Sequence, residues 1–265
     1  MKNNKKDNVV KKSINKLNTY LDENIANEDI KIKDYLLFSI KLNNVRVNRE
    51  EFLLRDFNNT KIPASYLDKK ELKKYAIKLL DNISLKNSAH AFISDLGGVI
   101  SLPSTLSADL IKSFSFTLKI IQELYYLYHD DELISNDYQI SELNYQKIMI
   151  MLVIMYHFKE GTYLIKNIVL NNQLCDEKII ILIDKYLNLK LLSKANMSKS
   201  LIRFIPVVGG VVSGSKALLE MKVMTTRLNN SLFKGYYLNI NDISDDKLIA
   251  LLEMNIKRIE ESNNE

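Results

Sequence analysis

The amino-acid sequence predicts an all-α protein, a multi-helix bundle with two apolar helical segments that are interrupted by glycine and proline. Three observations predict this fold class. The chain of 265 residues has only seven Gly and three Pro, too few turn formers for the many short strands of a sandwich or barrel. Its apolar residues recur at helical spacing over long stretches, and no stretch shows the strict apolar–polar alternation of a half-buried strand.

The predicted helices follow one another with few breaks. Apolar spacing predicts helices over 9–25, 69–81, 106–128, 141–158, 163–170, 176–187 and 244–261, and an amphipathic helix in the last part of 201–232. The pattern over 30–42 is mixed and is compatible with a helix that enters the body of the protein. Asn48, Asp68, Ser141 and Ser244 are the expected N-caps, with Glu51 three residues after Asn48. We expect an N-terminal helical extension over 1–41, a helical domain over 42–240 and a C-terminal helix over 241–265.

The composition excludes several classes of protein. Cys175 is the only cysteine, which rules out an internal disulfide framework and a multi-cysteine zinc site. The N-terminus is polar, without the apolar core of a signal peptide, so we expect a cytoplasmic location. No apolar run reaches the roughly 18 residues of a spanning helix. The nearest are the nine-residue runs Ile148–Tyr156 and Phe204–Val212, which fit a buried core helix or an interfacial segment.

Two short segments, Gly97–Pro103 and Pro206–Gly214, hold five of the seven glycines. Glycine inside an apolar helix costs about 1 kcal/mol relative to alanine, so such a cluster needs a physical reason. Gly210 and Gly214 have GxxxG spacing, which lets a second helix pack closely. The segments therefore fit a tight crossing inside a soluble bundle, or insertion into a bilayer surface. A phosphate-binding loop at 209–216 is disfavoured because the GxxxxGK[ST] spacing and a preceding strand are missing.

Charge makes the two segments unequal. The stretch 185–234 contains nine Lys or Arg and one acidic residue, a net charge of +8, whereas the whole chain carries +5. An anionic bilayer attracts such a zone by about 1 kcal/mol per well-placed cation. Nucleic acid is not expected, since the zone lacks interleaved aromatic residues. The predicted contacts to a membrane or partner are Lys199, Arg203, Phe204, Ile205, Pro206, Val207, Val208, Gly209, Gly210, Gly214 and Lys216. Gly97–Pro103 lacks basic flanks and is predicted to pack internally.

No arrangement of residues predicts catalysis, and no cofactor or metal is expected. His129 precedes Asp130 and Asp131, a sequence that fits either a metal cluster or the end of a long helix followed by a loop. Asp109 fits a carboxylate in the first helical turn or a polar binding residue. Asp109 and His129 are therefore the candidate polar site, and an enzyme is the weakest of the hypotheses.

Three motifs together resemble the EcsC family of Firmicutes. They are the stretches 45–53 (VRVNREEFL), 96–128 (from LGG to LYYLY) and 203–214 (RFIPVVGGVVSG), in the order of the family. The last two are also similar to the helical domain of YcjF-type GTPases. The chain departs from the family at His129, where glycine is usual, and at Lys112, where a polar amide is usual.

The resemblance implies a helical, membrane-associated bacterial protein, and it brings no established enzymatic activity. The first functional hypothesis is peripheral association with the inner face of the cell membrane through the apolar Gly/Pro segment and its basic flanks. The alternative is a soluble helical adaptor that binds a partner protein, with the glycine-rich segments as sites of close helix packing.

Overall fold

The computed structural model of the chain describes residues 32–41, 48–86, 106–134, 140–192, 210–238 and 243–263. These residues contain nine α-helices and no strand, so the predicted all-α class is confirmed. The predicted helix 9–25, the segment Gly97–Pro103 and residues 199–209 lie outside the described residues. The α-helices are α2 (Ile32–Lys41), α3 (Arg49–Phe57), α4 (Lys69–Lys86), α6 (Leu106–Tyr128), α7 (Glu142–Met155), α8 (Thr162–Leu164), α9 (Glu177–Leu192), α11 (Gly210–Tyr237) and α12 (Asp245–Asn263).

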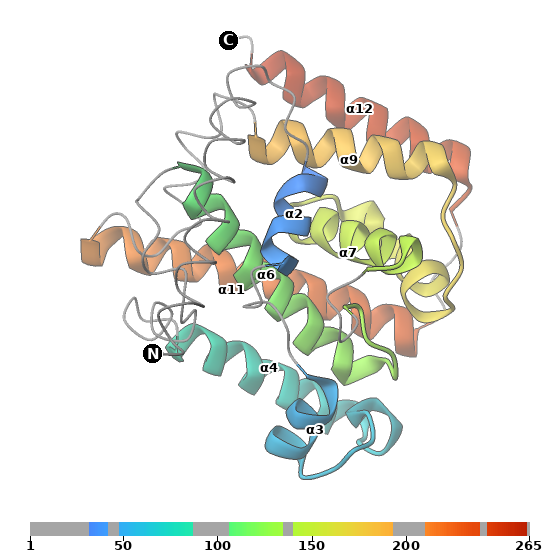
Figure 1. Cartoon of the computed structure of the whole chain (residues 1–265). Helices are drawn as coiled ribbons and strands as arrows, with labels where there is room; N and C mark the ends of the chain where they lie inside the picture. The colour runs from blue at the N-terminus through green and yellow to red at the C-terminus, as the bar shows by residue number, and fades with distance from the viewer. Residues whose placement is uncertain are drawn as a thin grey trace, which may run out of the picture.

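Helix α7 lies in the middle of the bundle (Figure 1). Every residue from Tyr145 to Met155 is buried, and the helix contacts α6, α9, α11 and the short π-helix η4 (Ile165–Leu170). A helix that is apolar on all sides has no face suited to water, so it must be enclosed by its neighbours. The run Ile148–Tyr156 was compatible with a buried core helix or an interfacial segment, and in the structure it belongs to a buried core helix.

Helix α6 has the predicted bounds, 106–128. The apolar residues at helical spacing that predict this helix form one stripe, and its described members are buried. They are Phe114, Leu118, Ile121, Leu124, Tyr125 and Tyr128. Helix α2 packs on α6, and the rings of Tyr35 and Phe114 stack with their centroids 5.9 Å apart. The backbone N–H of Ile32 donates to Asn188 Oδ1 on α9 at 2.9 Å, so α2 joins α6 to α9.

Helices α9 and α12 form a parallel pair at one edge of the molecule (Figure 1). Lys178 pairs with Glu253 at 3.4 Å and Lys185 with Glu260 at 3.0 Å, so each helix advances seven residues between the two bridges. The two bridges therefore lie on one side of the contact between the helices. Both helices also contribute buried apolar residues to the core, namely Ile179, Ile183, Leu187, Leu248, Leu252 and Ile256.

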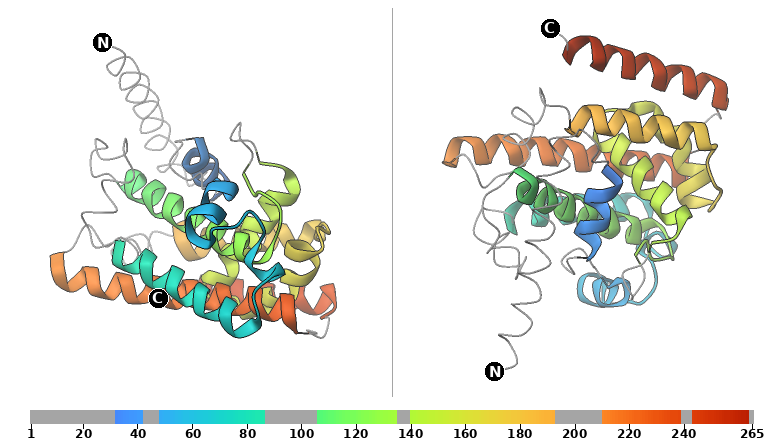
Figure 2. Two further views of the ribbon diagram at one scale, coloured as in Figure 1. Left: turned by 90° about the horizontal axis from the view of Figure 1, so that it is seen from below. Right: turned by 45° about the horizontal axis from the view of Figure 1, so that its top comes forward.

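Helices α4 and α11 lie side by side in opposite directions (Figure 2). The ammonium of Lys69, at the start of α4, lies 5.0 Å from the ring centroid of Tyr237, at the end of α11. In α11 the described residues include Gly210 and Gly214, in the first two turns. Helix α4 runs to Lys86, beyond the predicted end at 81, and α9 runs to Leu192, beyond the predicted end at 187.

The predicted N-caps are confirmed where hydrogen bonds describe them. Asn48 Oδ1 accepts from the N–H of Glu51, Asp68 Oδ1 from that of Glu71 and Ser141 Oγ from that of Asn144, at 3.1, 2.8 and 3.2 Å. Each side chain satisfies a backbone donor in the first turn that has no partner inside the helix. These three caps fix where α3, α4 and α7 begin.

The predicted helix 163–170 takes a different form, with three residues of α8 followed by the π-helix η4. Here α11 approaches η4 closely at Gly235. A Cβ atom built on Gly235 would lie 2.5 Å from Ile165 Cγ2 and 3.4 Å from Leu170 Cδ1. Glycine at 235 therefore permits the close contact between the two helices. Close helix packing was predicted from the sequence at the two Gly/Pro segments and not at Gly235.

We expect Gly235→Ala to lower the free energy of unfolding by about 1–3 kcal/mol, because the added methyl group meets a branched side chain that cannot rotate away. Urea unfolding followed by circular dichroism measures the change. Asn230→Ala, at an exposed position on the same helix, is the control and should change stability by less than about 0.5 kcal/mol. Equal stability of Gly235→Ala and the wild type would show that α11 and η4 have room to separate.

Candidate functional site

A lysine is enclosed in the core near the start of α7. The side chain of Lys147 has 0% exposure. Its Nζ donates to the hydroxyl of Tyr125 at 3.0 Å and lies 3.7 Å from Asp131 Oδ2. Burial lowers the pKa of Lys147, whereas the Asp131 carboxylate acts to raise it. A buried ammonium is tolerated only with partners of this kind, since an unpaired one costs several kcal/mol.

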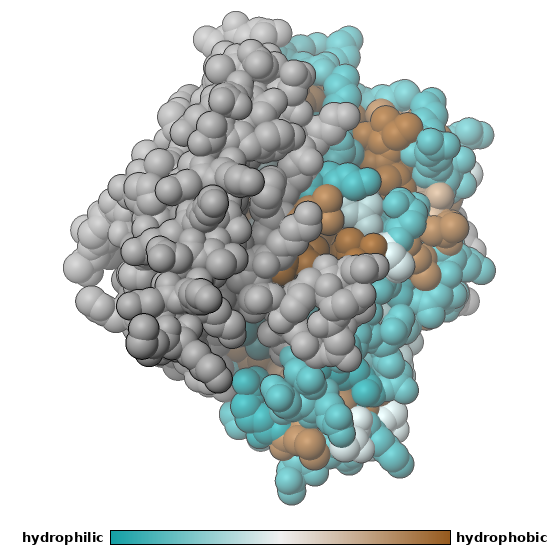
Figure 3. Space-filling model, in the orientation of Figure 1, coloured by the Kyte–Doolittle hydropathy of each residue, from teal (hydrophilic) through white to brown (hydrophobic). Residues whose placement is uncertain are grey.

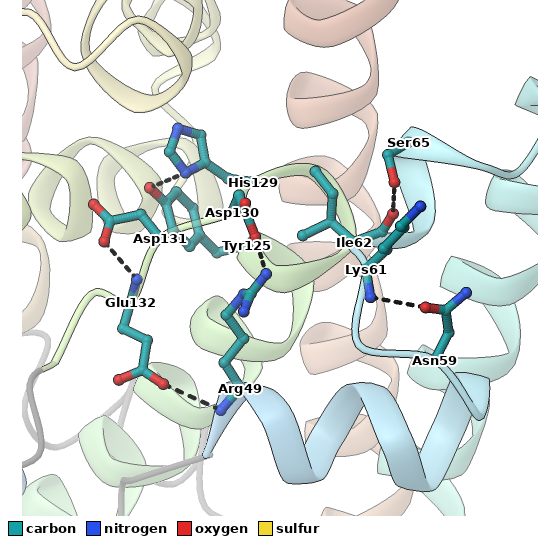
Figure 4. A network of polar contacts seen from close by, with 10 residues as sticks. All are labelled: Arg49, Asn59, Lys61, Ile62, Ser65, Tyr125, His129, Asp130, Asp131 and Glu132. Carbon is teal, nitrogen blue, oxygen red and sulfur yellow. Dashed lines mark hydrogen bonds and ion pairs between the residues drawn. The ribbon is translucent and has the colours of Figure 1, made fainter.

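Tyr125 connects Lys147 to His129. The Tyr125 hydroxyl lies 2.8 Å from His129 Nδ1, and the two rings stack with centroids 4.8 Å apart (Figure 4). An ammonium can only donate, so Lys147 occupies an acceptor position of the Tyr125 oxygen. The Tyr125 proton then donates to His129 Nδ1. This order of donors requires a neutral His129 ring with its proton on Nε2.

The surroundings of His129 favour the same neutral state. Burial lowers the pKa of His129 and the charge of Lys147 lowers it further, while a hydrogen bond to the backbone of Leu170 and the charge of Asp131 oppose them. Leu170 is the last residue of η4. His129 therefore ties the end of α6 to η4 and, through Tyr125, to α7.

The loop after α6 is held by α3 and α7. Arg49 forms an ion pair with Asp130, and its backbone N–H donates to Glu132 Oε1 at 3.4 Å (Figure 4). Asn144 Nδ2 on α7 donates to the Glu132 carbonyl at 2.9 Å. Neighbouring acidic side chains of the loop thus reach separate partners, which joins the α3 region to the Lys147 network.

The side chains of the proposed metal cluster do not converge on one point. His129 faces Tyr125, Asp130 faces Arg49 and Asp131 lies beside Lys147. In the part of the chain that the structure describes, no group of three or more His, Cys, Asp or Glu residues could hold a metal ion. His129 directly follows the last residue of α6. This position agrees with the interpretation in which His129 ends the long helix and a loop follows.

Asp109 and His129 are not brought together. Asp109 lies in the first turn of α6, whereas His129 follows its last residue. Twenty residues of helix separate the two by about 30 Å. The side chain of Asp109 is not among those described.

The predicted contact residues divide between two parts of the chain. Lys199 and 203–209 lie outside the described residues, while Gly210, Gly214 and Lys216 lie in the first turns of α11. Further along α11, after Lys216, the side chains of Leu219 and Val223 are 63% and 47% exposed to solvent. Residues four apart lie on one side of a helix. The two apolar side chains therefore form a small exposed pair, and Lys222 is exposed beside them.

Helix α11 is basic as well as locally apolar. It contains four Lys or Arg, at 216, 222, 227 and 234, and one acidic residue, Glu220. The opposite face is fixed in the bundle, where Tyr128 donates to Asn229 Oδ1 at 2.7 Å and Thr162 Oγ1 lies 2.9 Å from Ser231 Oγ. The exposed pair therefore stands on a rigid support. In Figure 3 the described surface of one face of the molecule is mostly hydrophilic, with smaller hydrophobic patches between.

Sequence reasoning missed Lys147 and Tyr125. The available signal was the position of Lys147 immediately before the apolar run Ile148–Tyr156, because a lysine bordering a core helix needs a polar partner. Tyr125 was assigned to the apolar stripe of α6, where its ring does lie. The spacing of residues in one helix cannot reveal that its hydroxyl meets a lysine from another.

Comparisons with family models, with curated proteins and with solved structures found no match to this chain. Among the described residues, no helix is both long enough and apolar enough to cross a membrane.

We expect Tyr125→Phe to lower the free energy of unfolding by about 1–3 kcal/mol, because it leaves Lys147 Nζ and His129 Nδ1 without their shared partner in the core. Thermal or urea unfolding measures the loss. Tyr66→Phe, at a 39% exposed tyrosine, is the matched control and should stay within about 0.5 kcal/mol of the wild type. Equal effects of the two substitutions would show that the buried hydroxyl contributes nothing specific.

Stability should fall as the pH drops below about 6.5, the ordinary pKa of histidine. The native pKa values of His129 and His157 are lowered, so the unfolded chain binds protons at a higher pH than the native chain does. Protonation therefore favours unfolding. Unfolding free energies at pH 7.5 and 5.5 measure how strongly stability depends on pH. His129→Gln should reduce this dependence, and His157 should account for what remains. An unchanged dependence in this variant would contradict the neutral His129 assignment.

Proposed function

We propose that this protein binds peripherally to an anionic membrane surface through the N-terminal half of the solvent face of α11. The observation that carries the proposal is the exposed pair Leu219 and Val223 on a helix with four basic residues and one acidic residue. In the sequence the apolar run Phe204–Val212 and the basic residues Lys199 and Arg203 come directly before and at the start of this helix, and they extend the same proposed surface.

The expected strength of binding is that of a reversible peripheral protein. Full burial of a Leu or Val side chain contributes about 1.5–3 kcal/mol, and a basic residue near an anionic leaflet contributes about 1 kcal/mol. Two apolar side chains and a few lysines therefore give weak attachment that depends on salt. Strong binding would need the apolar run 204–212 as well.

The alternative, a soluble adaptor for a partner protein, starts from the same exposed pair. An apolar pair fits a partner helix as well as a lipid surface. The net positive charge of α11 and of the zone 185–234 favours the lipid surface, because anionic headgroups neutralise many cations without a specific geometry. The resemblance to the EcsC family, which rests on the three motifs, supports the same choice.

Vesicle flotation at low salt tests the proposal. The wild type should float with vesicles that contain phosphatidylglycerol and stay at the bottom with phosphatidylcholine alone. The double variant Leu219→Glu/Val223→Glu should bind at least tenfold more weakly, because it replaces the inserted groups by charges that the leaflet repels. The matched control is Leu174→Glu/Ile181→Glu, which changes two residues that are 65% and 59% exposed on another part of the surface.

The proposal is wrong if the wild type fails to float with anionic vesicles at low salt. It is also wrong if the control variant loses as much binding as the α11 variant, since the effect would then reflect added negative charge alone. Equal binding to neutral and anionic vesicles would contradict the role given to the basic residues.

A further inference from the structure

Four basic side chains gather where α7 ends. His157 and Lys159 follow the helix in the chain, Lys190 belongs to α9 and Arg227 belongs to α11. We call these four residues the α7-end cluster. None of them takes part in the Lys147 network.

Hydrogen bonds place Arg227 and His157 at the end of α7. Arg227 Nη1 donates to the Met155 carbonyl at 2.7 Å, and its Nη2 lies 3.5 Å from His157 Nε2. The Tyr186 hydroxyl donates to the Tyr156 carbonyl at 2.9 Å. Lys190 follows Tyr186 by one helical turn, so it lies on the same side of α9, towards the end of α7.

The chain at His157 adopts a left-handed conformation, with φ of 82°. A non-glycine residue rarely takes this conformation, so the surrounding contacts must hold it there. His157 is exposed, and its ring faces the guanidinium of Arg227. The cluster is thus open to solvent at His157 and anchored at Arg227.

Among the described residues, the positive charge of the cluster is only partly balanced. Apart from burial, the causes that lower the pKa of His157 are the charges of Arg227, Lys190 and Lys159. Within the described ranges, no carboxylate forms an ion pair with any of these three residues. Glu160 follows Lys159 in the chain, and its charge, like that of Arg227, acts on Tyr186, so one carboxylate offsets part of the charge of the cluster. The carbonyl end of α7 offsets a further part, through the bond from Arg227.

We propose that the α7-end cluster binds the phosphate group of an anionic lipid headgroup, an inference that rests on the proposed function. Arg227 follows Leu219 and Val223 along α11 by two turns and one turn, so it stands on nearly the same side of the helix. A leaflet that receives the two apolar side chains therefore brings its headgroups to the cluster.

The chemistry of the four side chains suits a phosphate. A guanidinium has five N–H donors. In Arg227 the Met155 carbonyl takes one, and His157 Nε2 lies 3.5 Å from Nη2, so others are left for a ligand. Phosphate oxygens accept several charge-assisted hydrogen bonds at once, and arginine recognises them in a planar, two-point manner. A bound phosphate would relieve the repulsion among Arg227, Lys159 and Lys190 and would raise the pKa of His157.

The experiment follows the His157 ring by NMR in the full chain, during pH titrations with a soluble phosphate ester. The probe is dihexanoyl phosphatidic acid below its micelle concentration, compared with inorganic phosphate and with chloride at equal ionic strength. The lipid should raise the His157 pKa. Lys159→Gln/Lys190→Gln should weaken its binding about tenfold or more, because each lysine near an anionic group contributes about a fivefold effect. These two lysines make no hydrogen bond or ion pair between side chains of the described residues, so the variant should fold.

Lys73→Gln/Lys74→Gln removes the same charge from two exposed positions on α4 and should change the affinity less than twofold. Leu219→Glu/Val223→Glu separates this inference from the proposed function, since it should lose vesicle flotation and keep the response of His157 to the soluble lipid. If the wild type does not float with vesicles while the soluble lipid raises the His157 pKa, the phosphate site is supported and the proposed membrane docking is wrong.

Two results would overturn the phosphate site itself. One is a His157 pKa that neither the lipid nor inorganic phosphate raises. The other is an equal response in Lys159→Gln/Lys190→Gln and the wild type. If inorganic phosphate acts at the same concentration as the lipid, the assignment to a lipid headgroup is overturned and the cluster is a site for free phosphate.

Discussion

The arrangement of this protein depends on a helix that cannot face water. From Tyr145 to Met155, α7 is buried on every side, so the rest of the bundle must supply a complete shell. Helices α6, α9 and α11 and the π-helix η4 form that shell. The outer elements then cover the apolar faces that this first layer leaves, α2 on α6, α12 on α9 and α4 on α11. Hydrophobic burial around one central helix thus sets the order of the layers.

The same enclosure explains the polar network, because Lys147 enters the core with α7. Its charge must be met inside the shell, and Tyr125 and Asp131 meet it from α6 and from the loop that follows. These partners need positions of their own. His129 accepts the hydrogen bond of Tyr125, and Arg49 holds the loop that carries Asp131. Lys147 is buried while the Asp131 side chain is 54% exposed. Such a pair contributes little net stability, yet removal of the partners of a buried ammonium is costly. We therefore interpret the network as what fixes how α3, α6 and α7 meet.

The sequence predicted those features whose cause is local. The bounds of α6 follow from one continuous apolar stripe, and the caps Asn48, Asp68 and Ser141 follow from the side chains themselves. The π-helix η4 could not be predicted, because it accompanies the approach of Gly235 on α11, about 70 residues away in the chain. The Lys147 network likewise joins three elements. Most of the predicted membrane contacts, Lys199 and 203–209, lie outside the described residues, so that surface remains a prediction.

Helix α11 connects the two proposals to the core. Its buried face bonds to α6 through Asn229 and to α8 through Ser231, while Arg227 caps the carbonyl end of α7. A leaflet that binds the opposite face would therefore orient the whole bundle, since α11 cannot turn about its axis without breaking these bonds. Arg227 caps the end of α7 and is also proposed to bind an anion. It can do both because one of its N–H groups donates to Met155 while others remain available beside His157. A side chain held in this way loses little further freedom when an anion arrives, which is what favours binding at a preorganised site.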